Sequence, residues 1–215
     1  MTKKYDRHYF DRWYRGRNRI HSRSEVRRKI AMAVATAEYF LRRPIENVLD
    51  IGAGEGVWLS HLRAIRRGVS YTGVEPSEYA VERFGAERHL RQGTFGELAK
   101  LRLRGPFDLV VCSDVLHYLP AAAQEELIAR VAAALEPGGL LLVRDADAAG
   151  GWRFAATRIQ ERACALARRH WRQRFHYRSA AEWRRLLESA GFAVDVEPMS
   201  LGTPYANVLL AARRL

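Results

Sequence analysis

The sequence predicts an α/β fold with a mostly parallel sheet that helices cover on both faces. Three observations support this fold class. Short apolar runs alternate with helical patterns from residue 47 to residue 147. These runs are continuously apolar, as expected for strands that are buried on both faces. Two further strand-like runs, 192–201 and 205–215, are joined by a loop too short for a parallel crossover. We therefore expect seven strands, one of them antiparallel.

Turn and capping residues delimit the elements of the first half of the chain. Ser24 and Ser77 suit N-caps, Pro44 and Pro76 cannot continue the elements before them, and Gly85 suits a helix end. In order, we expect a helix at 24–41, a strand at 47–52, a helix at 57–65, a strand at 71–76, a helix at 77–85 and a weak strand at 89–95.

The second half continues the alternation and then departs from it. Pro137-Gly138-Gly139 is expected to end one helix and open the next strand. In order, we expect a strand at 107–114, a helix at 121–135, a strand at 139–147, a long helix at 150–175, a helix at 179–192 and the two edge strands. The long helix carries one apolar line, formed by Trp152, Ala156, Ile159, Ala163, Leu166 and His170.

The net charge of +12 is concentrated in two segments. Residues 1–30 hold eleven basic and three acidic residues, and residues 150–185 hold ten arginines against Glu161 and Glu182, so each segment carries +8. A general bias toward arginine explains the excess of arginine over lysine better than it explains this clustering. Two distant cysteines, no apolar run of about 20 residues and no apolar centre in the first residues predict a cytoplasmic protein with reduced thiols.

The stretch "VLDIGAGEG" places three glycines directly after a buried strand and before a helix. Such a turn lets a nucleotide-like ligand approach the backbone and the helix N-terminus. A dinucleotide site would use G-x-G-x-x-G, but here Val57 stands where that pattern needs its third glycine. The motif is instead D-x-G-x-G-x-G, and Glu75 ends the next strand. Two carboxylates suit a ligand with a cationic amino group better than one with phosphates.

Four stretches, "VLDIGAGEG", "GVEPS", "FDLVVCSDVLHYL" and "LEPGGLLLV", occur in the order and spacing of one family. The chain resembles the class I S-adenosylmethionine-dependent methyltransferases over residues 44–147, and the edge hairpin extends the resemblance to the C-terminus. The resemblance implies a Rossmann-like three-layer sandwich with strand order 3-2-1-4-5-7-6. It also implies S-adenosyl-L-methionine as cofactor and S-adenosyl-L-homocysteine as product.

The resemblance also implies which residues hold the cofactor. The methionine end would lie against the glycine loop, the ribose against the acidic end of the second strand, and the adenine beside the residues after the second and third strands. Many relatives have an acidic residue where Thr94 stands, and Phe95 is as well explained by core packing. The implied cofactor residues are Asp50, Gly52, Ala53, Gly54, Gly56, Glu75, Pro76, Ser77, Thr94, Phe95, Ser113, Asp114 and Val115.

We expect one domain of four segments. They are an N-terminal helical segment and lid (1–43), a cofactor-binding core (44–149), a basic helical insertion (150–178), and a C-terminal helix with the edge hairpin (179–215). Members of the family often fold such an N-terminal segment over the cofactor. Tyr9, Trp13 and Tyr14 are therefore candidates to close the pocket, and docking of an aromatic helix face on the core is the alternative.

His117 is the candidate catalytic residue, because it follows the strand beside which the acceptor would lie and a near-neutral pKa suits a general base. The alternative is that His117 packs at the start of the next helix. Tyr118 and Asp145 are candidate acceptor contacts. In the insertion, Trp152 and His176 are further candidates, with Phe154, Trp171, Phe175 and Tyr177 beside them. No His, Cys or Asp grouping has zinc-site spacing, so we expect no metal.

Three acceptor classes remain open from the sequence. The first is a small molecule, with an aromatic hydroxyl or a carboxyl group, that is anionic or bound to an acidic carrier protein. The second is a membrane lipid or quinone, reached through peripheral contact of helix 151–174 with an anionic membrane. The third is RNA, gripped by the basic segments. The stretch "SDVLHYLP" is unlike the "NPPY" type of amino-methylating nucleic-acid enzymes, so a nucleic acid is the least favoured acceptor.

Overall fold

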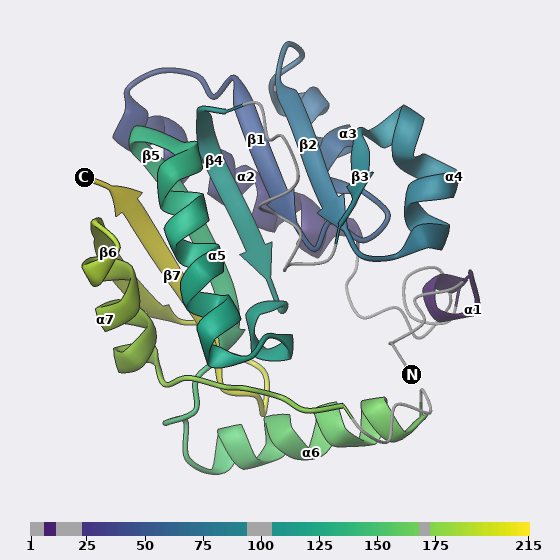
Figure 1. Cartoon of the computed structure of the whole chain (residues 1–215), viewed down its shortest axis with the longest axis vertical. Helices are drawn as coiled ribbons and strands as arrows, with labels where there is room; N and C mark the ends of the chain where they lie inside the picture. The colour runs from purple at the N-terminus through teal and green to yellow at the C-terminus, as the bar shows by residue number, and fades with distance from the viewer. Residues whose placement is uncertain (1–6, 12–22, 94–104, 168–172) are drawn as a thin grey trace.

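The computed structural model describes residues 7–11, 23–93, 105–167 and 173–215, and its centre is a seven-stranded sheet (Figure 1). The strands lie in the order β3-β2-β1-β4-β5-β7-β6. β7 is antiparallel to both β5 and β6, and the other pairings are parallel. The predicted fold class and strand order are confirmed. The strands are β1 (Asn47–Ile51), β2 (Ser70–Glu75), β3 (Leu90–Gln92), β4 (Phe107–Ser113), β5 (Leu135–Ala146), β6 (Phe192–Pro198) and β7 (Asn207–Arg214).

Helices cover both faces of the sheet and form a separate apolar core on each. One core joins α2, α3 and α4 to the sheet, and the other joins α5 and α7 to it. In Figure 1, α5 and α7 lie in front of the sheet, with α2 and α3 behind it. The helical elements are α1 (Arg7–Phe10), α2 (Arg23–Leu41), α3 (Trp58–Ile65), α4 (Glu78–Arg88), the 3₁₀ turn η3 (Leu116–Tyr118), α5 (Ala121–Ala134), α6 (Trp152–Ala167) and α7 (Ala180–Ser189).

The register of the central strands brings three strand ends together. Ile51 pairs with Cys112, and Cys112 pairs with Val143, so β1, β4 and β5 reach the same edge of the sheet side by side. All three strands are parallel, so their carboxyl ends meet there. In an open α/β sheet this edge is where ligands bind.

Several predicted boundaries are wrong, among them those of α4, α5 and the long helix. α4 continues through Gly85 to Arg88, because His89 adopts the left-handed conformation (φ +52°) that ends the helix. α5 stops at Ala134, because Leu135 is already extended and pairs with Phe107, so the Pro-Gly-Gly stretch lies inside β5. The long helix is described as far as Ala167 and does not reach residue 175, because residues 173–179 are irregular.

Among the described residues, no helix combines the length and the apolar character that crossing a bilayer requires.

Candidate active site

The loop after β1 turns through three glycines with positive φ. Gly52, Gly54 and Gly56 have φ angles of +79°, +56° and +67°. A Cβ at Gly52 would lie 2.4 Å from Cγ2 of Val115, so the backbone there packs tightly against the segment after β4. Among the described residues, a Cβ at Gly54 would meet only the Phe10 ring, at 3.9 Å. The backbone at Gly54 therefore borders open space.

Glu75 joins the end of β2 to the glycine loop. Its carboxylate accepts a hydrogen bond from the Gly54 N–H at 2.8 Å and another from the Ser77 N–H at 3.0 Å. Ser77 in turn caps α4, because its side chain accepts from the N–H of Ala80. The loop backbone is also tied to β2, since the N–H groups of Gly52 and Ala53 both donate to the Val74 carbonyl. The glycine loop, the Glu75 carboxylate and the N-terminus of α4 thus form one connected cradle. Pro76 lies between Glu75 and the capping residue Ser77.

Asp50 lies beneath this cradle and is buried. Tyr71 on β2 donates a 2.7 Å hydrogen bond to its carboxylate. Burial raises the pKa of Asp50 to about 7, a shift that the Tyr71 hydrogen bond opposes and the nearby Glu75 carboxylate reinforces. The folded chain therefore holds a proton on Asp50 at pH values where the unfolded chain has lost it.

We expect the free energy of unfolding of the cofactor-free protein to fall as the pH rises from about 6 to 8. The raised pKa of Asp50 alone accounts for about 1 kcal/mol of this loss, because the folded state must release a proton that the unfolded state does not hold. Glu38 and Asp108 have lowered pKa values and stay ionised throughout this range. Urea unfolding at several pH values measures the slope. Asp50→Asn should make it shallower, with the raised pKa of His117 leaving a residual slope in the same direction, and a stability that rises with pH would contradict the assignment.

The segment after β4 borders the glycine loop from the other side. Asp114 has a positive φ of +57°, which is unusual for a residue with a side chain. Its carboxylate pairs with Arg144 of β5, and its N–H donates to the Arg144 carbonyl at 2.8 Å. Ser113 is exposed and Val115 is buried against Gly52. The turn is therefore fixed to both neighbouring strands.

His117 and Asp145 form a buried pair at this edge of the sheet. The Nδ1 atom of His117 lies 2.6 Å from Oδ1 of Asp145, and the two side chains are only 4% and 2% exposed. Asp145 also accepts from the N–H groups of His117 and Ala146. Because a carboxylate only accepts, Nδ1 of His117 carries a hydrogen and Nε2 keeps its lone pair when the ring is neutral. The buried Nε2 has no hydrogen-bond partner among the described residues.

Aromatic rings enclose the imidazole of His117. The rings of Tyr118, Tyr177 and Phe175 have centroids 4.3, 5.4 and 5.9 Å from it. The hydroxyl of Tyr177 is likewise buried without a partner in the described part of the chain. Both polar atoms are therefore buried within this cluster of rings, without a hydrogen-bond partner among the described residues. Buried polar groups are rarely left unpaired, so this is where a ligand would be expected.

Gln124 of α5 holds this enclosure in place, and the sequence analysis missed it. Its side-chain amide donates to the carbonyls of Leu116, Leu119 and His176, while its oxygen accepts from Arg178. The N–H of His176 donates to the His117 carbonyl at 2.7 Å. These contacts hold the irregular segment 173–179 against η3 and α5. No local sequence pattern indicates that the Gln124 side chain bonds the carbonyl of His176, which lies 52 residues further along the chain.

The pKa of His117 is raised by its partner. Burial alone would lower it, but the Asp145 carboxylate, through its charge and its hydrogen bond, more than compensates. Glu161 and Asp114 contribute in the same direction. The imidazole is therefore a stronger base than an ordinary histidine.

The structure brings only some of the residues predicted to contact the acceptor close to His117. Tyr118 and Asp145 contact His117, and His176 bonds it through the backbone. Trp152 does not join them, because its side chain is 67% exposed. The side chain of Tyr9, and all of Trp13, Tyr14, Thr94, Phe95 and Trp171, lie outside the described residues. Phe10 was not selected as a site residue, yet it is buried beside Gly54 and packs on Tyr79.

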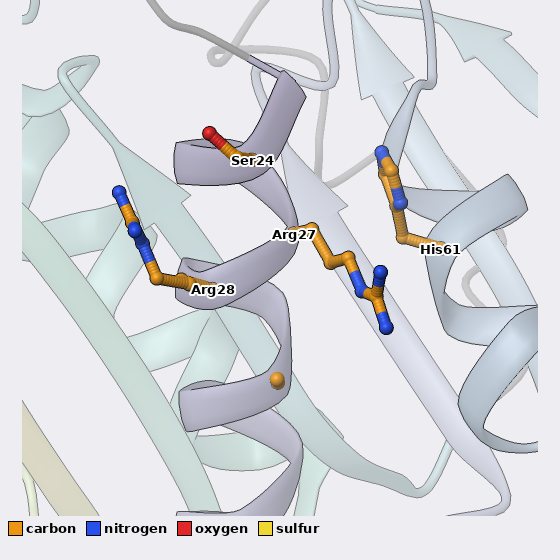
Figure 2. Close-up of a pocket in the computed structure, with 5 residues that line it drawn as sticks. Ser24, Arg27, Arg28 and His61 are labelled. Carbon is orange, nitrogen blue, oxygen red and sulfur yellow. The ribbon is translucent and has the colours of Figure 1, made fainter.

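A basic hollow of about 490 Å³ lies between the N-terminal part of α2 and the first turn of α3, which directly follows the glycine loop. It is lined by Ser24, Arg27, Arg28, Ala31 and His61. Figure 2 shows Arg27 and His61 on the two sides of the gap between the helices, with Arg28 on the other side of α2. Within the described ranges, no group of His, Cys, Asp or Glu residues is placed to hold a metal ion.

A family model described as a methyltransferase domain matches residues 5–197. The chain belongs to the methyltransferase-domain family. The match confirms the predicted family, and solved methyltransferase structures at 15–20% identity share its fold.

Individual proteins resemble this chain over most of its length. Demethylspheroidene O-methyltransferase of Rhodobacter capsulatus is 28% identical over 174 residues, which are 80% of this chain and 42% of that protein. Squalestatin hexaketide synthase of a Phoma species is 31% identical over 167 residues, which are 71% of this chain and 6% of that protein. The chain thus spans less than half of either curated relative. A methyltransferase of Archaeoglobus fulgidus superposes with a TM-score of 0.70 at 15% identity, covering 97% of this chain and 100% of that one.

The glycine loop of this methyltransferase fits its cofactor. The space beside Gly54 would be filled by a Cβ, and the Glu75 carboxylate lies at its border. A cationic ligand close to Asp50 would favour the ionised form of that buried carboxyl group. The loop thus combines main-chain N–H groups and open space with the acidic side chains of Asp50 and Glu75. This combination suits a nucleoside that carries a positively charged amino acid part.

Proposed function

We propose that this methyltransferase transfers the methyl group of S-adenosyl-L-methionine to a hydroxyl oxygen of a small, planar, apolar acceptor. The observation that carries the proposal is the buried His117–Asp145 pair, whose Nε2 has no hydrogen-bond partner among the described residues and whose ring is packed by aromatic side chains. A hydroxyl acceptor needs a base, since the pKa of a phenol is about 10, whereas a carboxylate acceptor needs none. A buried histidine held by a carboxylate supplies that base.

The cofactor, when bound, supplies an electrophilic methyl group on a sulfonium centre. Asp50, Gly52, Ala53, Gly54 and Gly56 would hold its methionine end. Glu75 would bind the ribose hydroxyls, with Pro76 and Ser77 beside the adenine and Ser113, Asp114 and Val115 along the opposite wall. These roles follow from the family resemblance, and the cradle formed by loop, carboxylate and helix N-terminus supports them.

His117 acts on the acceptor. Its Nε2 accepts the hydroxyl proton as the oxygen becomes a nucleophile, and the resulting imidazolium is stabilised by Asp145 at Nδ1. Tyr118, Tyr177 and Phe175 provide flat apolar surface on which a conjugated acceptor can lie. Holding the oxygen in line with the methyl group supplies much of the acceleration, because orientation removes an entropic cost.

Oxygen as the acceptor atom and a small molecule as the substrate are supported by one relative in particular. The R. capsulatus protein is an O-methyltransferase by name, and it matches 80% of this chain. Delivery of the acceptor on an acidic carrier protein is a second candidate, which the basic hollow with Arg27 and Arg28 favours, because a cationic surface steers an acidic partner.

The test is a matched set of acceptors of one ring system: naphthol, naphthylamine and naphthoic acid. With labelled cofactor, we expect the hydroxyl compound to be methylated, and its rate to rise with pH along a single deprotonation above the usual histidine pKa of about 6.5. The direction follows because only neutral His117 can accept the proton. Preferred methylation of the amine, or a rate for naphthol that does not change with pH, would count against a hydroxyl acceptor.

A further inference from the structure

Helix α6 has a second apolar face, on the side that points away from the sheet. Its inner side is occupied: Thr157 and Ala165 are buried, and Phe154 packs edge-on against Tyr177 at 5.1 Å. At 3.6 residues per turn, the opposite side of the helix is formed by Trp152, Ala155, Ile159, Ala163 and Leu166. All five of these side chains are exposed, the three large ones to 67%, 70% and 40%. We call these five residues the outer face of α6.

Arginines border the outer face on both sides. Arg158 and Arg162, both exposed, follow one edge one turn apart. Arg153 lies at the other edge, and its guanidinium is 5.2 Å from the centre of the Trp152 ring. The one carboxylate within α6, Glu161, lies on the inner side and accepts a hydrogen bond from Tyr118. The outer face thus combines apolar residues at its centre with positive charge at both edges.

We propose that the outer face of α6 docks on an anionic membrane surface. An interfacial helix needs an apolar face to enter the acyl boundary and basic residues at its edges to meet anionic headgroups. Tryptophan is the side chain most enriched at that boundary, and arginine can keep its charge in water while its stem covers apolar surface. A second copy of the chain is a poorer occupant, because pairing two outer faces would bring their arginines together, in a protein of net charge +12.

Helix α6 contacts the residues around His117 on the side opposite its outer face. The inner side of the helix forms part of the wall around His117, since Phe154 packs on Tyr177 and Glu161 bonds Tyr118. Figure 1 shows α6 below the carboxyl ends of β4 and β5, with the irregular segment returning above it to α7. One helix therefore separates the membrane surface from the acceptor enclosure. Supply of a membrane-dissolved acceptor depends on the proposed function, whereas the docking itself does not.

Flotation of the full chain with lipid vesicles tests the docking without acceptor or turnover. We expect the protein to float with vesicles of phosphatidylcholine and phosphatidylglycerol, to stay behind with phosphatidylcholine alone, and to be released by salt. The double variant Trp152→Ser/Ile159→Ser should lower the partition constant by about tenfold or more for each side chain. Arg158→Gln/Arg162→Gln should lower it by about 25-fold on the anionic vesicles, roughly fivefold for each charge.

Matched control variants distinguish binding through the outer face of α6 from non-specific binding of the protein to vesicles. Tyr39→Ser removes an aromatic side chain that is 78% exposed on α2, and Arg184→Gln/Arg185→Gln removes the same charge from exposed positions on α7. Neither control should change the partition constant. Equal effects of the controls and the α6 variants would overturn the proposal, and so would no flotation with anionic vesicles. A dimer in sedimentation that Ile159→Ser dissociates would assign the outer face to a second copy instead.

Discussion

Replacing His117 with glutamine is expected to lower kcat by about 10²–10⁴-fold, the usual contribution of a positioned general base. Glutamine is uncharged and of similar length, and its amide can still donate to Asp145. It cannot take up the acceptor proton. We therefore expect KM and the affinity for S-adenosylhomocysteine to change little, because the glycine loop and Glu75 are untouched. Initial rates with naphthol and calorimetry with S-adenosylhomocysteine measure the two effects separately.

The variant Asp145→Asn tests whether His117 acts as a general base or has only a packing role. Removing the carboxylate removes the main cause of the raised pKa of His117, so the rise of rate with pH should move to lower pH. A structural role for His117 would leave the position of that rise unchanged in the asparagine variant. It would also show as a lower melting temperature of His117→Gln with kcat unaltered. That pair of results would remove His117 from the chemistry.

The core of the fold could be predicted because its determinants are local. Continuous apolar runs mark β1, β4 and β5, and the spacing of three glycines marks the turn before α3. Boundaries failed where tertiary contacts overrule local propensity. Gly85 remains helical because the packed helix continues beyond it, and the Pro-Gly-Gly stretch stays in β5 because pairing with β4 already begins at Leu135.

The site could be predicted only in part, because its contacts join distant residues. His117 and Asp145 were each expected at the carboxyl end of a strand, but their pairing needs the register that sets β4 beside β5. The sequence gives no sign of the role of Gln124, since its partners are the backbone carbonyls of turn and loop residues and the side chain of one arginine. The periodicity of α6 correctly places Trp152, Ile159, Ala163 and Leu166 on one face, while Phe154 and Ala165 lie on the other and His170 is outside the described residues. Periodicity alone does not tell whether that face is buried, and here it is exposed.

The second large effect is expected at Glu75. Glu75→Gln should weaken S-adenosylhomocysteine binding by about 10²–10⁴-fold, because two hydrogen bonds to a charged acceptor contribute about 1.5–3 kcal/mol each. The carboxylate is buried at the border of the cradle and can accept from both ribose hydroxyls. An amide offers one acceptor oxygen and turns its NH₂ toward the N–H group of Gly54 or Ser77. Calorimetry with S-adenosylhomocysteine measures the loss directly.

Glu78→Gln is the matched control for this charge change, since Glu78 lies three residues further on, exposed in the first turn of α4. It should bind S-adenosylhomocysteine as the parent chain does. The melting temperature without ligand separates lost binding from lost folding, because Glu75 also ties the loop to α4. If Glu75→Gln folds and still binds S-adenosylhomocysteine with unchanged affinity, the ribose does not lie at the end of β2. The cofactor would then have to be oriented differently on the glycine loop, and the acceptor oxygen could no longer be assigned to the side of His117.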